Sequence, residues 1–171
     1  LASLPSSSHQ LVLLFNAGEQ GKSAACVLEH SVGHELECSG PFGSFHLHED
    51  PERDLLFVGT GTGIAPLWSM LSSLFEQSCS QTMTLLWGLR RESDIYYLEE
   101  LQQWAKSYTN FSYILTLSQP AHNWKGKAGR VTHLLQEFPQ VDHLAVYVCG
   151  NRKMVTEVTS LIQRKGVCPV Y

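Results

Sequence analysis

The segment with the clearest capacity for chemistry is residues 59–66, Gly-Thr-Gly-Thr-Gly-Ile-Ala-Pro. It follows an apolar run at 55–58 and precedes apolar residues at helical spacing from Leu67 to Leu74. Glycine lets a backbone approach a ligand closely, and the unpaired N–H groups and dipole of a helix start favour an anion. The segment is therefore predicted to be a phosphate-binding loop, with Pro66 in the first helical turn, where its missing N–H is no loss. The alternative is a tight turn whose glycines serve packing alone.

A second junction of this kind lies at residues 146–154. An apolar run ends at Cys149 and Gly150, and a helical pattern that includes Met154 follows. The carboxyl ends of neighbouring parallel strands meet at one edge of a sheet, so Cys149 is expected beside the glycine-rich loop. The thiol then either lines the pocket around a reacting ring or fills space as a small apolar residue. Position alone favours neither interpretation.

A third junction, at residues 86–91, ends in Arg90 and Arg91. Arginines that follow a strand of an open α/β sheet either meet the ribose or phosphate groups of a nucleotide or form a solvated pair of charges. Ser93 or Asp94 is expected to cap the helix that follows, because both side chains accept hydrogen bonds from backbone N–H groups.

The composition is that of a globular protein without a strongly charged surface. Of the 171 residues, 43% are hydrophobic and 16% are charged, and the net charge of −4 argues against a nucleic-acid-binding protein, which would carry a basic face. No apolar run approaches the ~20 residues that span a bilayer, and no export signal is visible. The five cysteines and the paired histidines lack metal-site spacing, so we expect no metal site and reduced thiols in a cytoplasmic protein.

The front of the chain carries short β-like runs at 10–15, 35–38 and 44–48 and a helical stretch at 23–28. Three strands are too few for an independent core, so this part is predicted to be the C-terminal remnant of an antiparallel β-barrel. The polar residues at 50–54 are expected to form a hinge.

Strand and helix patterns alternate in the rest of the chain. The expected strands are 55–58, 83–87, 111–117 and 144–149, and the expected helices are 65–78, 94–106, 130–137 and 152–165. Almost continuously apolar strands are typical of a parallel sheet that helices cover on both faces. Repeated strand–helix units predict a doubly wound parallel sheet that binds ligands outside the carboxyl ends of its strands. We therefore expect an α/β domain at 51–171 after a partial antiparallel β-barrel at 1–50.

Together these motifs resemble the ferredoxin–NADP reductase superfamily, most closely its NAD(P)H-dependent flavin reductases and the reductase components of oxygenases. Residues 61–66 are similar to the family's nicotinamide-nucleotide loop at every position, and Cys149, Gly150 and Met154 match its Cys-Gly-x-x-x-Met segment. The resemblance extends over nearly the whole chain. Further stretches that follow the family's order are 87–91, 94–101, 117–120, 124–126 and 129–131.

The resemblance implies an NAD(P)H-dependent, FAD-containing reductase. In such an enzyme hydride passes from NAD(P)H to FAD, and electrons then leave to an acceptor protein or to free flavin. Cys149 would line the nicotinamide pocket rather than act as a nucleophile. The residues implied for nucleotide binding are Gly61, Thr62, Gly63, Ile64, Pro66, Gly88, Arg90, Arg91, Ser118, Cys149, Gly150 and Met154.

The choice of coenzyme is expected to depend on the residue after Ser118. NADP-specific members of the family carry an arginine there, which forms a bidentate pair with a phosphate. This chain has Gln119, which favours NADH, although Arg90 and Arg91 are placed to bind the additional phosphate of NADPH instead.

On the flavin side, Ala2 and Ser3 resemble the end of the family's Arg-x-Tyr-Ser-x-Ala-Ser motif, and Ser23 falls where a helix start would face the flavin pyrophosphate. The arginine and tyrosine of that motif, which grip FAD in the family, do not precede Ala2 in this chain, so FAD binding is left open. The chain is then either a working reductase or a non-catalytic nucleotide-binding module with a truncated flavin part.

Overall fold

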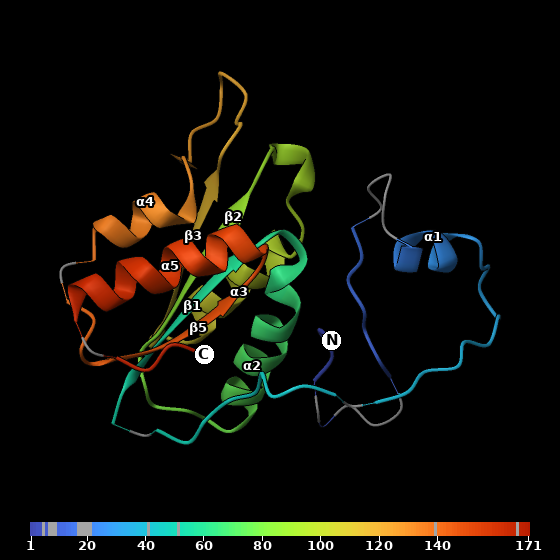
Figure 1. Ribbon diagram of the computed structural model, residues 1–171, viewed down its shortest axis with the longest axis horizontal. Coiled ribbons are helices and arrows are strands. Elements are labelled where there is room, and N and C mark those ends of the chain that lie inside the picture. Colours follow the sequence, from blue (N-terminus) through green and yellow to red (C-terminus); the bar gives the residue numbers. More distant parts are fainter. Residues whose placement is uncertain are drawn as a thin grey trace.

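The computed structural model describes residues 1–4, 6, 10–16, 22–40, 42–50, 52–138, 140–166 and 168–171, and the side chains of 22–24 lie outside the description. Its centre is a five-stranded parallel sheet in the order β4-β3-β2-β1-β5 (Figure 1). The strands are β1 (Asp54–Thr60), β2 (Met83–Leu89), β3 (Phe111–Leu117), β4 (Lys127–Ala128) and β5 (Leu144–Cys149). The α-helices are α1 (Lys22–Leu28), α2 (Ile64–Glu76), α3 (Leu98–Ser107), α4 (Val131–Gln136) and α5 (Arg152–Lys165).

Each face of the sheet has its own hydrophobic core. Along β1, Leu55 and Phe57 pack with α2 and α3 on one face, whereas Leu56 and Val58 pack with α4 and α5 on the other. Successive residues of a strand point to opposite faces, so a strand that is covered on both sides needs an apolar residue at every position. This requirement explains the continuous apolar runs in the sequence.

The helices that follow two neighbouring strands lie on opposite faces of the sheet. β1 and β5 are paired, with Gly59 opposite Cys149. The chain passes from β1 into α2 in one core and from β5 into α5 in the other. Because the chain leaves these adjacent strand ends in opposite directions, a crevice forms between them at the carboxyl edge.

The predicted α/β architecture is confirmed, and β3, β5 and α5 have the predicted bounds. The start of α3 was predicted wrongly, at residue 94 rather than Leu98. Residues 92–94 form a separate 3-10 turn, in which the Arg91 amide donates to the Asp94 carboxylate over 3.0 Å. Asp94 therefore closes this turn instead of capping α3. The two-residue strand β4 was not predicted, because so short a run has no pattern.

The described part of residues 1–50 contains α1, close to the predicted helix, but no strand. The predicted barrel strands at 10–15, 35–38 and 44–48 are therefore not observed. Most of their large apolar side chains are exposed, Leu11 by 67% and Leu36 by 48%, although Leu14 and Leu47 are partly buried against the core. Strands without partners that bury one face are not stable, which explains the difference. This segment extends beyond α2, on the side away from α4 and α5 (Figure 1).

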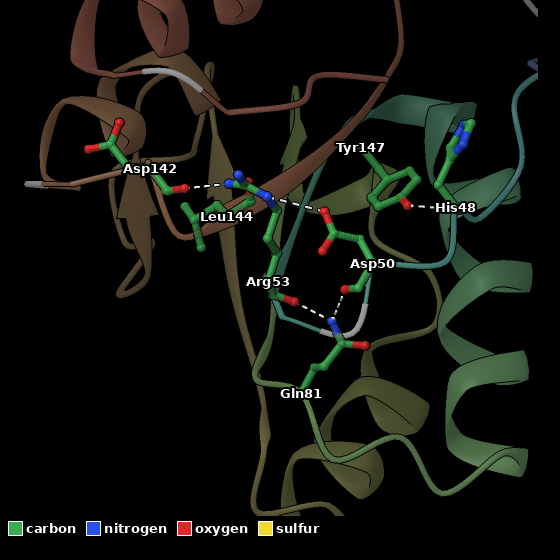
Figure 2. Close-up of polar contacts among 7 residues, drawn as sticks. All are labelled: His48, Asp50, Arg53, Gln81, Asp142, Leu144 and Tyr147. Carbon is green, nitrogen blue, oxygen red and sulfur yellow. Dashed lines mark hydrogen bonds and ion pairs between the residues drawn. The ribbon is translucent and has the colours of Figure 1, made fainter.

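The polar segment before β1, which was predicted to be a hinge, forms a hydrogen-bonded joint with neighbouring segments (Figure 2). Nε of Arg53 lies 3.1 Å from the Asp50 carboxylate. The same guanidinium donates hydrogen bonds to the main-chain carbonyls of Asp142 and Leu144. Arg53 therefore ties the chain that enters β1 to the chain that enters β5.

Two further contacts complete this joint. The Gln81 side-chain amide, just before β2, donates to the carbonyls of Asp50 and Arg53. The His48 amide donates to the Tyr147 hydroxyl over 3.0 Å (Figure 2). Arg53 and Gln81 lie before the strands they adjoin, so the centre of the joint is at the amino edge of the sheet, opposite the crevice.

Candidate functional site

A cleft of about 1660 Å³ lies at the carboxyl edge of the sheet, where the loops after β1, β2, β3 and β5 meet. The fold brings ten residues of the sequence prediction together along its walls. They are Gly61, Thr62, Gly63, Gly88, Arg90, Arg91, Ser118, Cys149, Gly150 and Met154. Because these residues come from the ends of four strands and from the segments that follow them, the cleft is the candidate functional site.

The glycine-rich loop enters α2 through a 3-10 turn at Gly61–Gly63. Gly61 has a positive φ of 54°, a backbone conformation that glycine adopts more readily than other residues. A Cβ there would meet nothing within 4 Å, so the backbone conformation and not a lack of space favours glycine at this position. The first N–H groups of the turn have no partner within the helix and lie at its positive end. Ile64 and Pro66 do not line the cleft: Ile64 is fully buried in the core, and Pro66 lies in the first turn of α2, as predicted.

Two other glycines let neighbouring loops approach each other. A Cβ on Gly63 would lie 2.3 Å from the Cys149 carbonyl oxygen, and one on Gly150 would lie 2.3 Å from the Thr60 hydroxyl oxygen. Both distances are far below van der Waals contact, so the loops after β1 and β5 need glycine where they touch. Close packing thus explains why residues 63 and 150 are glycines, whereas backbone conformation explains why residue 61 is one.

Cys149 is partly buried on the cleft wall at the end of β5. Burial raises the pKa of its thiol above the ordinary cysteine value, so the neutral form predominates near pH 7. A neutral thiol is a poor nucleophile, which agrees with a lining role. Nearby, Thr60 Oγ1 is buried and has no hydrogen-bond partner among the described residues. A buried unpaired hydroxyl on a cleft wall is available to a bound molecule.

The loops after β2 and β3 form a polar wall. The Ser118 amide donates to the Leu89 carbonyl over 3.0 Å, and the Gln119 amide donates to the Arg90 carbonyl over 2.8 Å. These bonds continue the pairing of β2 and β3 beyond the strand ends. Gln119 and Arg90 therefore lie side by side, and the side chains of Arg90 and Arg91 are exposed to the cleft mouth.

The residues predicted on the flavin side lie elsewhere. Ala2 is buried against the core of α2, and its amide donates to the Val12 carbonyl over 2.8 Å. The Ser3 carbonyl accepts from the Ser69 hydroxyl of α2 over 2.7 Å. Ser23 is in α1, and its side chain lies outside the described residues. Ala2 and Ser3 thus form hydrogen bonds with other residues of this chain.

Sequence reasoning missed several residues that line the cleft, among them Tyr96, Arg130, His133 and Lys153. Burial raises the pKa of the Tyr96 hydroxyl to about 12, which keeps it a hydrogen-bond donor. Arg130 lies within a stretch that the family resemblance included, so that stretch contained a usable signal. Tyr96 also lies within such a stretch, 94–101, but no local pattern indicates its hydrogen bond to the Gly61 carbonyl, 35 residues away.

Metal clusters and membrane-spanning helices are both absent from the described part of the chain. There, no group of three or more His, Cys, Asp and Glu side chains is arranged to hold a metal ion. No helix within the same residues is long and apolar enough to cross a membrane. All five cysteines are unpaired.

Comparison with known proteins supports a nucleotide site. Residues 57–160 match the family described as oxidoreductase NAD-binding domain. The anthranilate 1,2-dioxygenase electron transfer component of Acinetobacter baylyi is 30% identical over 99% of this chain and 50% of its own length. A ferredoxin–NAD(P)(+) reductase component of naphthalene 1,2-dioxygenase/salicylate 5-hydroxylase systems from Ralstonia is 32% identical over 82% of this chain and 43% of its own length. The chain thus spans about half the length of these relatives.

The fold itself also has solved counterparts. The CS-b5R domains of human Ncb5or superpose with a TM-score of 0.80 at 21% identity, covering 90% of this chain and 46% of that one. At this level of identity the likeness concerns the fold alone.

Proposed function

The chain belongs to the ferredoxin–NADP reductase superfamily as an oxidoreductase NAD-binding domain, and we propose that its cleft binds NAD(P)H for a flavoprotein reductase. One observation carries this proposal: Gly63, at the start of α2, lies against Cys149 and Gly150 where β1 and β5 end, and Thr62 lines the same cleft. A helix start that favours an anion thus adjoins an uncharged wall that suits a ring. A dinucleotide has a pyrophosphate and a nicotinamide ring to match.

The residues present fit such a ligand. Thr62 and Gly63 would bind the pyrophosphate through backbone N–H groups. Thr60 offers an unpaired buried hydroxyl to a polar group of the ligand. Cys149 would line the nicotinamide as a neutral thiol. Arg90, at the far wall, is placed for the ribose or phosphate of the adenosine half.

NAD(P)H supplies a hydride to a flavin when it is bound in such a site. The residues of this chain bind the nucleotide, orient it and exclude water from it, and no general base is required of them. Alignment of reacting groups is a large part of catalysis in such reactions. Cys149 acts as a pocket residue in this scheme.

A flavin is not assigned to the described residues of 1–50. Ala2 and Ser3, which the resemblance associates with FAD, pack on α2 instead. These described residues also form no strand that would hold the cofactor. We therefore propose the nucleotide-binding half of the reaction for this chain and derive no step through FAD.

The electron acceptor is proposed from the relatives. The names of the two relatives above describe an electron transfer component and a reductase component of dioxygenase systems. By analogy, we propose that electrons from the complete reductase pass to an acceptor protein of an oxygenase system, with free flavin as the other acceptor.

The proposed coenzyme is NADH, because Gln119 cannot form the bidentate phosphate pair that arginine forms. Arg90 lies beside Gln119 and is the residue able to offset this loss. Calorimetric titration of the purified chain with each coenzyme separates the two effects. NADH is expected to bind at least as tightly as NADPH. Tenfold tighter binding of NADPH would show that the interpretation of Gln119 is wrong.

The function itself is tested by absorption spectroscopy with and without added FAD, followed by titration with NADH. A flavin band that bleaches with NADH would establish a working reductase. A colourless protein that binds NADH would be the nucleotide-binding half, and its redox role would depend on a flavin held elsewhere. Absence of NADH binding at millimolar concentration would refute the proposal.

A further inference from the structure

Three hydrogen-bond donors converge on one main-chain oxygen, the carbonyl of Gly61. The Ile64 amide donates to it within the turn. The Trp87 indole N–H donates over 3.1 Å, and the Tyr96 hydroxyl donates over 3.0 Å. Both aromatic residues come from β2 and the loop that follows it, whereas Gly61 lies in the loop after β1. An oxygen that accepts bonds from three directions is held in one orientation.

The orientation of this carbonyl sets that of the next amide. In a trans peptide the C=O and the N–H that follows it point to opposite sides, so the Thr62 N–H points away from Trp87 and Tyr96. At a helix start the N–H groups point out from the end of the helix. Thr62 lines the cleft, so its N–H lies where an anion is favoured.

The ring of Tyr96 is itself fixed by its neighbours. It meets the fully buried Trp87 edge to face, with ring centroids 4.9 Å apart. The Tyr96 ring also meets the Tyr97 ring edge to face, with centroids 5.2 Å apart, and Tyr97 stacks on Trp68 at 4.2 Å. Tyr96 is thus packed against two aromatic residues, which restrict its ring and hold its hydroxyl on the Gly61 carbonyl.

We propose that Tyr96 is a positioning residue for the dinucleotide, whose hydroxyl fixes the Gly61–Thr62 peptide so that the Thr62 N–H faces the pyrophosphate. The same bond links the phosphate-binding loop to the loop that carries Arg90 and Arg91, and so sets the spacing of two walls of the cleft. Tyr96 need not touch the ligand, because it acts through the peptide. The inference rests on the proposed function of the cleft.

The test is Tyr96→Phe, which keeps the packed ring and removes only the donor. The probe is ADP-ribose, which carries the pyrophosphate without the nicotinamide. Loss of one hydrogen bond to the loop is expected to weaken binding of ADP-ribose and of NADH about fivefold each. The matched control is Tyr97→Phe, which removes the hydroxyl of the adjacent tyrosine and is expected to bind both as the wild type does.

A second measurement reports on the peptide directly. In ¹H–¹⁵N spectra of the wild type, ADP-ribose is expected to shift the Thr62 amide resonance. In Tyr96→Phe this resonance is expected to start from a different position and to shift less. Wild-type affinity in Tyr96→Phe, or a Thr62 resonance that ADP-ribose does not move, would overturn the inference while leaving nucleotide binding intact. Failure of the wild type to bind either ligand would overturn the proposed function as well.

Discussion

Replacing Gly63 by alanine distinguishes the effect of close packing on stability from the effect of backbone conformation, because the two have opposite signs at this position. Gly63 has φ −61° and ψ −12°, values that alanine adopts readily. At such positions a change from glycine to alanine normally stabilises a protein by about 0.4–1 kcal/mol. The added Cβ would, however, lie 2.3 Å from the Cys149 carbonyl oxygen, 2.7 Å from its carbonyl carbon and 2.9 Å from the Gly150 Cα. All three atoms are backbone, so the two loops must move apart.

The size of the effect follows from these contacts. Overpacking costs about 1–3 kcal/mol, and contacts this short with main-chain atoms belong at the upper end. After the backbone gain is subtracted, Gly63→Ala should lower the free energy of unfolding by about 2 kcal/mol. For a chain of this length, that corresponds to a fall of about 4–8 °C in Tm. NADH binding should weaken too, since the phosphate-binding loop is displaced.

Urea and thermal unfolding measure the stability change, and calorimetry measures NADH affinity. The matched control is Gly59→Ala, whose Cβ would meet the flexible Leu67 Cδ1 at 3.0 Å. That side chain is able to yield, so the control should lose less than about 1 kcal/mol. If Gly63→Ala unfolds at or above the wild-type temperature and binds NADH equally well, the packing explanation for this glycine is refuted.

Two further predictions concern other parts of the chain. Arg53→Ala removes an ion pair of 3.1 Å and two bonds to carbonyls, and should lower the free energy of unfolding by about 1–2 kcal/mol in urea titrations. The control is Lys153→Ala, which breaks only the exposed 4.0 Å pair with Glu157 and should cost less than about 0.5 kcal/mol. Equal losses of unfolding free energy in the two variants would contradict the stabilising role assigned to the Arg53 contacts. Because burial raises the pKa of Cys149, its alkylation by iodoacetamide should be slow near pH 7 and should keep rising above pH 9, the ordinary cysteine value. Mass spectrometry should find the exposed Cys26 and Cys38 modified first, and faster reaction of Cys149 at pH 7 would contradict its burial.

The sheet could be predicted from the sequence because its physics is local. A strand that is buried on both faces must be apolar throughout, and the run at 144–149 shows this directly. The carboxyl ends of parallel strands share an edge, so Cys149 was expected beside the glycine-rich loop. The pairing of β1 with β5, which the sequence did not predict, brings Cys149 against Gly63. Asn151, a favourable residue before a helix, accepts from the Met154 amide over 3.0 Å at the start of α5.

Other features depend on contacts that no local pattern encodes. The run at 10–15 has strand-like residues, but a strand also needs a neighbour to pair with. Asp94 was expected to cap a helix, but its carboxylate accepts a hydrogen bond from the Arg91 amide within a 3-10 turn instead. The bond from Tyr96 to Gly61 joins two loops, and only the folded sheet brings them together.

The most direct test of the central claim is a crystal structure of the chain with bound NADH. The proposed function predicts pyrophosphate oxygens about 2.7–3.2 Å from the N–H groups of Thr62 and Gly63, with the nicotinamide ring toward Cys149. A nucleotide bound elsewhere, for instance in the groove between α4 and α5 that His133 and Arg164 line, would contradict it.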